Sequence, residues 1–213
     1  MPFLVKGIFF VLWFVLAQNA YGQFFDSIQT SLEHPPRPEV KFDSRNSFIG
    51  ARYARIYGIK AGLDYNSTFK FGLGYNWLSS DVFRTMSIRN SRGEVEEVKA
   101  QFAFNYLSPY AEYVFYKKEP WNISVSALLG FGRANYAYFD SYWVHTSTNP
   151  DFVMVYEPYM TARYRLFKYI GVGAGVGYRL AVSQDKFSKS RLNSPIYVIK
   201  LRLYLADLYR DLM

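Results

Sequence analysis

The chain has 213 residues, is 50% hydrophobic and 20% aromatic, and carries a formal net charge of +8. It contains no cysteine, which excludes both a disulfide framework and a lipid anchor on an N-terminal cysteine. After the first residues no uniform apolar stretch is long enough for a spanning helix, so a helical inner-membrane protein is excluded.

Residues 1–22 are predicted to be a secretory signal peptide that is removed. Lys6 precedes the apolar run Gly7–Ala17, and Ala20-Tyr21-Gly22 then provides small residues where a signal peptidase cleaves. The alternative is a transmembrane anchor. It is disfavoured because the apolar run is shorter than the roughly 20 residues that a spanning helix needs.

Residues 23–38 are expected to form a periplasmic helix followed by a proline-rich linker. Phe25, Ile28 and Leu32 recur at helical spacing, and Pro35-Pro36-Arg37-Pro38 follows them. The place of this helix stays open. It could lie on a membrane surface, plug the foot of the domain that follows, or meet a partner.

From residue 39 onward, apolar residues alternate with polar residues or glycine at the period of a β-strand. The clearest case runs from Ile170 to Val182, where one face is continuously apolar and the other is a row of glycines that ends in Arg179. A narrow closed barrel in a bilayer suits such a strand, because lipid covers the apolar exterior and glycines leave room inside. Eight segments share the pattern: 39–48, 53–65, 69–77, 102–116, 121–131, 152–166, 170–182 and 197–205.

We therefore predict an all-β fold, in which residues 39–213 form an eight-stranded antiparallel up-and-down transmembrane β-barrel behind a short N-terminal helix. The first strand is assigned partly because such barrels have an even number of strands. Half of each strand would face the lumen, which explains a mean hydropathy of only −0.10. A soluble periplasmic sandwich is the alternative architecture.

Loop lengths predict the orientation. Connections at 66–67, 117–120 and 167–168 are tight, whereas those at 79–99, 139–151 and 184–195 are long and polar. Bacterial barrels keep short turns in the periplasm and long loops outside. The expected location is the outer membrane of a Gram-negative bacterium, with both termini periplasmic.

The segment 102–116 needs a change of phase. Phe102, Phe104 and Tyr106 lie at even positions, whereas the apolar residues between Ala111 and Phe115 lie at odd ones. If all of them face outward, a β-bulge is required near Ser108-Pro109, because proline cannot donate a ladder hydrogen bond and is tolerated at such a site.

Two of the long loops carry specific expectations. Asn90-Ser91-Arg92-Gly93 is predicted to be the tip of a hairpin, so the first long loop would consist of two strand extensions above the membrane. In the last long loop, Lys186, Lys189 and Arg191 either contact anionic lipopolysaccharide at the outer rim or belong to a solvated loop.

The interior of a barrel of about eight strands is filled by side chains. Ten charged residues fall on predicted inward faces: Lys60, Asp64, Lys70, Glu112, Glu157, Arg163, Arg165, Arg179, Lys200 and Arg202. Buried charges must be paired, so we expect a salt-bridge network that holds the barrel shut; a proton path or an ion site is the alternative. Seven of the ten are basic, so water, tyrosine hydroxyls or Asp43 must contribute. Because these basic residues face inward, the net charge does not indicate nucleic-acid binding.

In several short sequence segments the chain resembles small eight-stranded outer-membrane barrels of the OmpA/OmpX-like kind, and uncharacterised barrel proteins of Bacteroidota. They are residues 43–48 (DSRNSF), 71–75 (FGLGY), 173–179 (GAGVGYR) and 193–197 (NSPIY). The resemblance covers nearly all of the mature chain and implies a monomer surrounded by outer-membrane lipid and inserted by the barrel insertion machinery. It implies no particular activity.

The predicted role is non-enzymatic, structural or interacting, through the extracellular loops or the N-terminal tether. The alternative is an outer-membrane lipid-modifying enzyme: His145-Thr146-Ser147 followed by Glu157 resembles the histidine, serine and acid of lipid A deacylases. No cofactor is predicted. The two histidines, His34 and His145, are far apart and there is no cysteine, so no metal site is predicted either.

Overall fold

The computed structural model describes residues 23–49, 52–90, 92–183 and 192–204. The predicted signal peptide, the cluster Lys186, Lys189 and Arg191, and the end of the last predicted strand lie outside these residues. A helix covers residues 23–32, and ten strand segments follow. They are β1 (Arg37–Ile49), β2 (Arg52–Tyr65), β3 (Phe69–Leu78), β4 (Phe83–Arg89), β5 (Val95–Lys118), β6 (Trp121–Phe139), β7 (His145–Ser147), β8 (Asp151–Phe167), β9 (Ile170–Ser183) and β10 (Ser194–Leu203).

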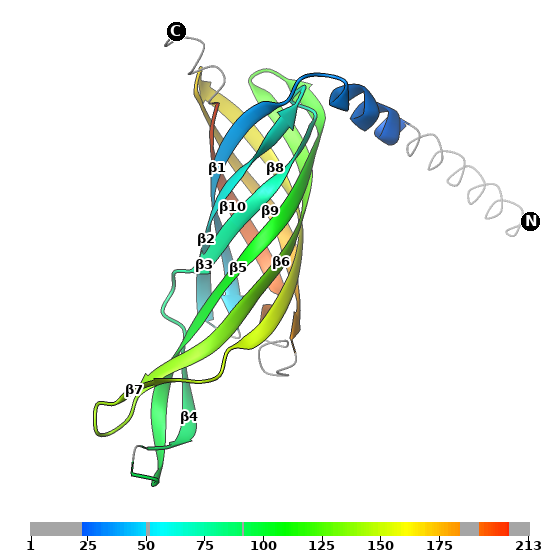
Figure 1. The fold of residues 1–213 in the computed structure, drawn as a ribbon. Helices are drawn as coiled ribbons and strands as arrows, with labels where there is room; N and C mark the ends of the chain where they lie inside the picture. The colour runs from blue at the N-terminus through cyan, green and yellow to red at the C-terminus, as the bar shows by residue number, and fades with distance from the viewer. Residues whose placement is uncertain (1–22, 50–51, 91, 184–191, 205–213) are drawn as a thin grey trace, which may run out of the picture.

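Eight of these strands close into an antiparallel barrel (Figure 1). The ladder runs β5-β3-β2-β1-β10-β9-β8-β6, and the pairing of β5 with β6 completes the ring. The order is up-and-down, since sequence neighbours among the barrel strands pair throughout and β1 closes onto β10. This confirms the predicted fold, including the first strand, which pairs with β2 along its whole length from Arg37 to Ile49.

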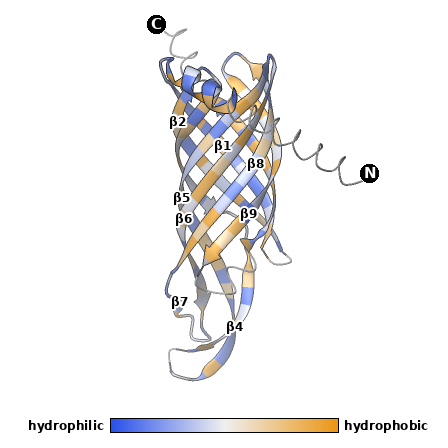
Figure 2. Cartoon of the chain, turned by 90° about the vertical axis from the view of Figure 1, so that its right-hand side faces the viewer, coloured by the Kyte–Doolittle hydropathy of each residue, from blue (hydrophilic) through white to orange (hydrophobic). Residues whose placement is uncertain are grey.

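Alternation of side chains divides the wall into an outer apolar face and an inner face. On β9, Val172, Val176 and Leu180 are 39 to 55% exposed, whereas Arg179 is fully buried. Figure 2 shows the resulting stripes of hydrophobic and hydrophilic residues along the strands. Glycines on the inner face give space to large neighbours, as predicted: a Cβ on Gly130 would meet the ring of Tyr106.

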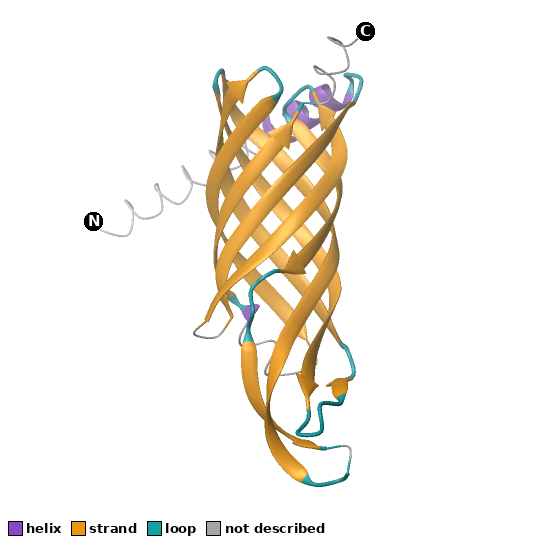
Figure 3. Ribbon diagram, turned by 90° about the vertical axis from the view of Figure 1, so that its left-hand side faces the viewer, coloured by secondary structure: helices purple, strands orange, loops and turns teal. Residues whose placement is uncertain are grey.

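The two ends of the barrel differ. At one end the strands are joined by tight turns, such as the one at Asn66 and Ser67, whose φ angles of 51° and 56° are left-handed. The N-terminal helix lies at this end, and the long connections lie at the opposite end (Figure 3). We refer to the two ends as the turn end and the loop end.

Strand β5 corrects the prediction for residues 102–116. The inward face of β5 is continuous from Phe102 to Val114, so Phe102, Phe104 and Tyr106 point into the lumen and are at most 4% exposed. Leu107 pairs with Phe131 and Tyr110 with Leu128, so the register against β6 does not shift at Pro109. The bulge lies between Val114 and Tyr116, close to the turn end.

At the loop end, β5 and β6 continue beyond the barrel. The pairing of β5 with β3 stops at Asn105, and β5 extends a further ten residues, or roughly 33 Å, to Val95. β4 pairs with this extension and β7 pairs with the end of β6, giving a protruding sheet in the order β4-β5-β6-β7. The turn at residues 90–94 closes the β4–β5 hairpin, as predicted, with Asn90 N donating to Glu94 O at 2.8 Å.

The N-terminal helix contacts the outside of the barrel. The ring of Phe24 meets the outward ring of Tyr113 edge-on, with centroids 4.6 Å apart. Since β1 already begins at Arg37, the linker is shorter than the predicted one. Among the described residues, no helix has both the length and the apolar character that crossing a bilayer requires.

Candidate functional site

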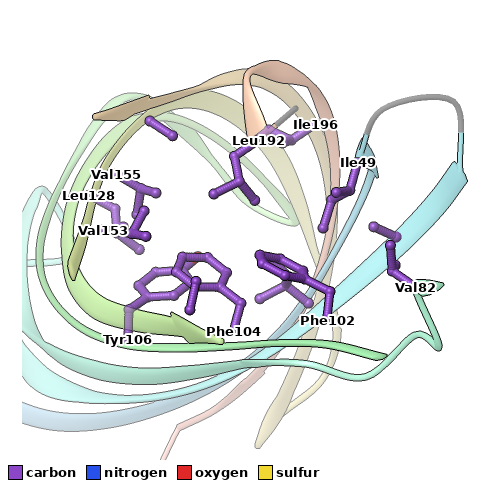
Figure 4. Packing of buried hydrophobic residues seen from close by; sticks show 14 of the residues in the cluster. Ile49, Val82, Phe102, Phe104, Tyr106, Leu128, Val153, Val155, Leu192 and Ile196 are labelled. Carbon is purple, nitrogen blue, oxygen red and sulfur yellow. The ribbon is translucent and has the colours of Figure 1, made fainter. Parts of the chain in front are cut away.

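The lumen of the barrel is filled by two layers of side chains, one apolar and one charged. The apolar layer occupies the loop end, where residues from several strands meet (Figure 4). Phe102, Phe104 and Tyr106 project from β5, with successive ring centroids 6.3 and 4.9 Å apart. They pack in one cluster with Ile49, Leu128, Val153, Val155, Leu192 and Ile196, each 5% exposed or less.

The charged layer begins below the aromatic rings, with Glu157 between two arginines. Arg45 Nη1 donates to Glu157 Oε2 at 2.5 Å, and Arg179 Nε donates to Glu157 Oε1 at 2.5 Å. Arg45 also donates to the hydroxyl of Tyr106 at 2.8 Å and to Asp43 at 3.0 Å. None of Arg45, Arg179 and Glu157 is exposed.

A second group of ion pairs surrounds Glu112 in the middle of the lumen. Lys41 and Lys200 each donate to Glu112 Oε2 at 3.1 Å, and Arg163 Nη1 lies 3.7 Å from Oε1. Lys60 Nζ lies 2.5 Å from Asp43 Oδ2 of the first group. Lys60 and Lys200 also both lie over the ring of Tyr159, at 5.5 and 4.6 Å from its centroid, which connects the two groups. These residues come from β1, β2, β5, β8 and β10, so the ion pairs tie opposite walls of the barrel together.

At the turn end the layer finishes around Arg202. Its Nη2 lies 2.7 Å from Glu39 Oε2 and also pairs with Asp64. The ring of Tyr204 lies under two guanidinium groups, with Arg202 Cζ at 4.5 Å and Arg165 Cζ at 4.7 Å from its centroid. A small cavity of about 60 Å³ opens here, lined by Arg37, Pro38, Glu39, Asp64, Ser67, Arg165, Arg202 and Tyr204.

The charges of the lumen do not balance one to one. Among the described residues, eight basic and five acidic side chains are buried there: Lys41, Arg45, Lys60, Lys70, Arg163, Arg179, Lys200 and Arg202, with Glu39, Asp43, Asp64, Glu112 and Glu157. Every one of the five acids lies within 4.0 Å of at least two basic groups. Sharing of carboxylates therefore offsets much of the excess positive charge.

The structure places nine of the ten sequence-derived lumen charges in this layer. The exception is Arg165, which lies at the mouth, is 27% exposed along its side chain and pairs with the exposed Glu119 at 3.2 Å. Sequence reasoning left Glu39, Lys41 and Arg45 out of the network, although the alternation of the first strand places all three on its inner face.

His145, Ser147 and Glu157 are not brought together. His145 and Ser147 lie in β7 on the protruding sheet and are exposed, whereas Glu157 is buried between two arginines. Along β6 the partner of Glu157, Leu128, is eleven residues from the partner of His145, Phe139, or roughly 35 Å. Glu157 cannot orient His145 in this arrangement. Within the described part of the chain, no three histidine or acidic side chains form a group that could hold a metal ion.

A closed antiparallel barrel with an apolar outer wall and a polar, side-chain-filled interior is a transmembrane β-barrel. No protein-family model matches the sequence, and no curated protein matches it either. Among solved structures, Neisserial surface protein A (NspA) is similar, with 14% sequence identity, a TM-score of 0.54, and coverage of 78% of this chain and 96% of that chain. At this identity the likeness shows the fold alone.

Two further structures align at lower scores. Ail, the attachment invasion locus protein of Yersinia pestis, crystallised with the heparin analogue sucrose octasulfate, has 10% identity and a TM-score of 0.47, and covers 79% of this chain and 96% of that chain. The N-terminal β-barrel domain of Pseudomonas aeruginosa OprF has 14% identity and a TM-score of 0.44, with coverage of 79% and 98%.

Proposed function

We propose that the protein is a closed, non-enzymatic outer-membrane barrel that displays the protruding sheet β4-β5-β6-β7 to the cell exterior as an interaction surface. It would act as a monomer after insertion by the barrel machinery, with its loop end outward and both termini in the periplasm. The observation that carries the proposal is the contrast between an occluded lumen and a sheet that extends far beyond it.

Closure of the lumen argues against passive transport. A solute would have to displace the aromatic residues of the apolar layer and then break ion pairs whose partners have no access to water. Breaking one buried pair costs about 3 to 5 kcal/mol, so opening several at once is prohibitive. The useful surface of the molecule is therefore its exterior.

The tip of the protruding sheet exposes large apolar side chains. Trp143 is 83% exposed and Phe139 55%, and the ring of Phe139 lies 6.4 Å from Trp143 and 5.0 Å from His145. Rigid exposed aromatic residues that keep their geometry are typical of binding hot spots.

The β6–β7 loop is held in one conformation by hydrogen bonds. Asp140 Oδ1 accepts from the backbone of Tyr142 at 3.0 Å and of Val144 at 2.9 Å. Ser141 donates to Glu96 on β5 through its backbone nitrogen at 2.9 Å and through its hydroxyl at 2.5 Å. A partner would therefore meet a preorganised surface.

The absence of cysteine allows a direct test of location and orientation. We expect a Ser141→Cys variant to react with a membrane-impermeant maleimide on intact cells, and an Asn66→Cys variant at a tight turn to react only after the outer membrane is opened. The reverse pattern would contradict the orientation, and equal labelling of both sites in a soluble fraction would contradict the location. A photocrosslinker at residue 142 should then capture a surface partner that is lost in Trp143→Ala.

A further inference from the structure

One charged residue stands out on the outer wall. Many of the described barrel positions pair with a residue on each of the two neighbouring strands. Among these positions, Arg133 on β6 is the only charged residue that faces outward. It is exposed, and no ion pair within the described residues includes it. A guanidinium on the lipid-facing side of a barrel needs an anionic partner or water, because hydrocarbon solvates neither its charge nor its five donors.

The height of Arg133 on the wall is set by the strand. Twelve residues separate it from Trp121 at the turn end of β6, which is about 40 Å along the strand. With the usual tilt of about 40°, this is roughly 30 Å along the barrel axis, close to the thickness of the hydrocarbon core. Arg133 therefore lies at the boundary between hydrocarbon and headgroups at the loop end.

Arg133 lies above an apolar groove on the outer wall. Its cross-strand neighbours are Asn105 on β5 and Phe152 on β8. One step toward the turn end, Leu107 pairs with Phe131, and these two side chains are 63% and 43% exposed. The groove has a volume of about 340 Å³ and is lined by Tyr75, Asn105, Tyr106, Leu107, Phe131, Gly132, Arg133 and Phe152.

The groove thus combines one cation and a side-chain amide at headgroup height with apolar side chains below them. We propose that it binds the lipid A part of lipopolysaccharide, with a phosphate on Arg133, a hydrogen bond from Asn105, and an acyl chain against Leu107 and Phe131. The proposal rests on the outer-membrane location and outward loop end proposed above, since that leaflet presents phosphorylated lipid A. Lipid A is the occupant we infer because its phosphate complements the charge of Arg133 and its acyl chain continues along the apolar outer wall.

The purified full-length barrel in detergent can test this with defined lipids. Native mass spectrometry would measure the dissociation constants of phosphorylated lipid A, the same lipid A without phosphate, and phosphatidylglycerol. We expect Arg133→Gln to weaken binding of phosphorylated lipid A about tenfold, the usual loss for one charge-assisted hydrogen bond. Arg133→Lys should keep most of the affinity. The matched control is Arg52→Gln, which removes an exposed arginine at the same end of the barrel.

Three outcomes would overturn the proposal: unchanged lipid A affinity in Arg133→Gln, equal affinity for the dephosphorylated lipid, or phosphatidylglycerol bound as tightly as lipid A. If Arg133→Gln does not fold, comparing the affinities of the unaltered protein for the three lipids still decides whether it prefers phosphorylated lipid A. Failure of the proposed location would appear separately, in the cell-labelling pattern of Ser141→Cys and Asn66→Cys, because the lipid measurement does not depend on the membrane in which the protein resides.

Discussion

Arg45 and Glu157, which are 112 positions apart in the chain, form an ion pair in the lumen with Nη1 and Oε2 2.5 Å apart and neither side chain exposed. The pair joins β1 to β8, two strands that are not neighbours in the ladder. Together with Arg179 from β9, Glu157 links three walls of the barrel, and the stability of the fold should depend on it.

Removing the carboxylate of Glu157 should therefore destabilise the folded barrel. We predict that Glu157→Gln lowers the free energy of unfolding by about 3 kcal/mol or more, because Arg45 and Arg179 would share a buried site without their carboxylate. Urea unfolding in detergent, followed by tryptophan fluorescence, measures this. The matched control is Glu119→Gln, whose carboxylate is 76% exposed and pairs with Arg165; a surface pair of this kind contributes less than about 1 kcal/mol. Equal effects of the two substitutions would show that the lumen network does not stabilise the barrel.

The two-layer lumen predicts an absence of conductance. In planar bilayers the protein should show no stepwise channel openings. Phe104→Ala should also remain closed, because the charged layer beneath the aromatic residues stays intact. It should nevertheless lose about 3 kcal/mol of stability through the cavity that the ring leaves. Unitary openings in the unaltered protein would contradict the closed lumen, and openings only in Phe104→Ala would assign closure to the apolar layer alone.

Gly130 should not tolerate a side chain. A Cβ at this position would overlap the ring of Tyr106 and a methyl group of Val155, both on the lumen side. We predict that Gly130→Val reduces the fraction of protein that folds in detergent, as seen by the heat-dependent mobility of folded barrels on gels. Ala127→Val on the same strand adds methyl groups on the outer face and should fold normally. Normal folding of both variants would contradict the packing described for the lumen.

Period-two alternation was sufficient to predict eight barrel strands, the outward faces of seven of them and the tight turns. It failed on β5, where Phe102, Phe104 and Tyr106 were assigned to the outside because apolar residues were expected to face lipid. The lumen of this barrel is apolar at the loop end, and a sequence pattern cannot distinguish an aromatic residue that faces lipid from one that faces other side chains. The bulge was misplaced as a consequence, since Pro109 was needed to explain a change of phase that does not occur.

The charged layer was predictable only in part. Inward charges follow from strand phase: all ten were assigned on that basis, and nine of them lie in the charged layer. Their partners do not follow, because Arg45 and Glu157 meet through the register of five successive strand pairs that no local pattern encodes. The imbalance of charge was visible in the sequence. The way in which this imbalance is compensated could be seen only in the three-dimensional structure, where each acid contacts at least two basic groups.

A cysteine scan of β6 tests most directly whether lipid hydrocarbon covers the outer wall of the barrel. Single cysteines at positions 123 to 129 and at 131, labelled with a fluorophore and reconstituted in vesicles that contain lipids with quenching acyl chains, report contact with lipid residue by residue; position 130 is left out because it accepts no side chain. We predict strong quenching at Ile123, Val125, Ala127, Leu129 and Phe131, and little at the positions between them. Uniformly weak quenching, or stronger quenching at the even positions, would contradict a lipid-facing barrel of this register.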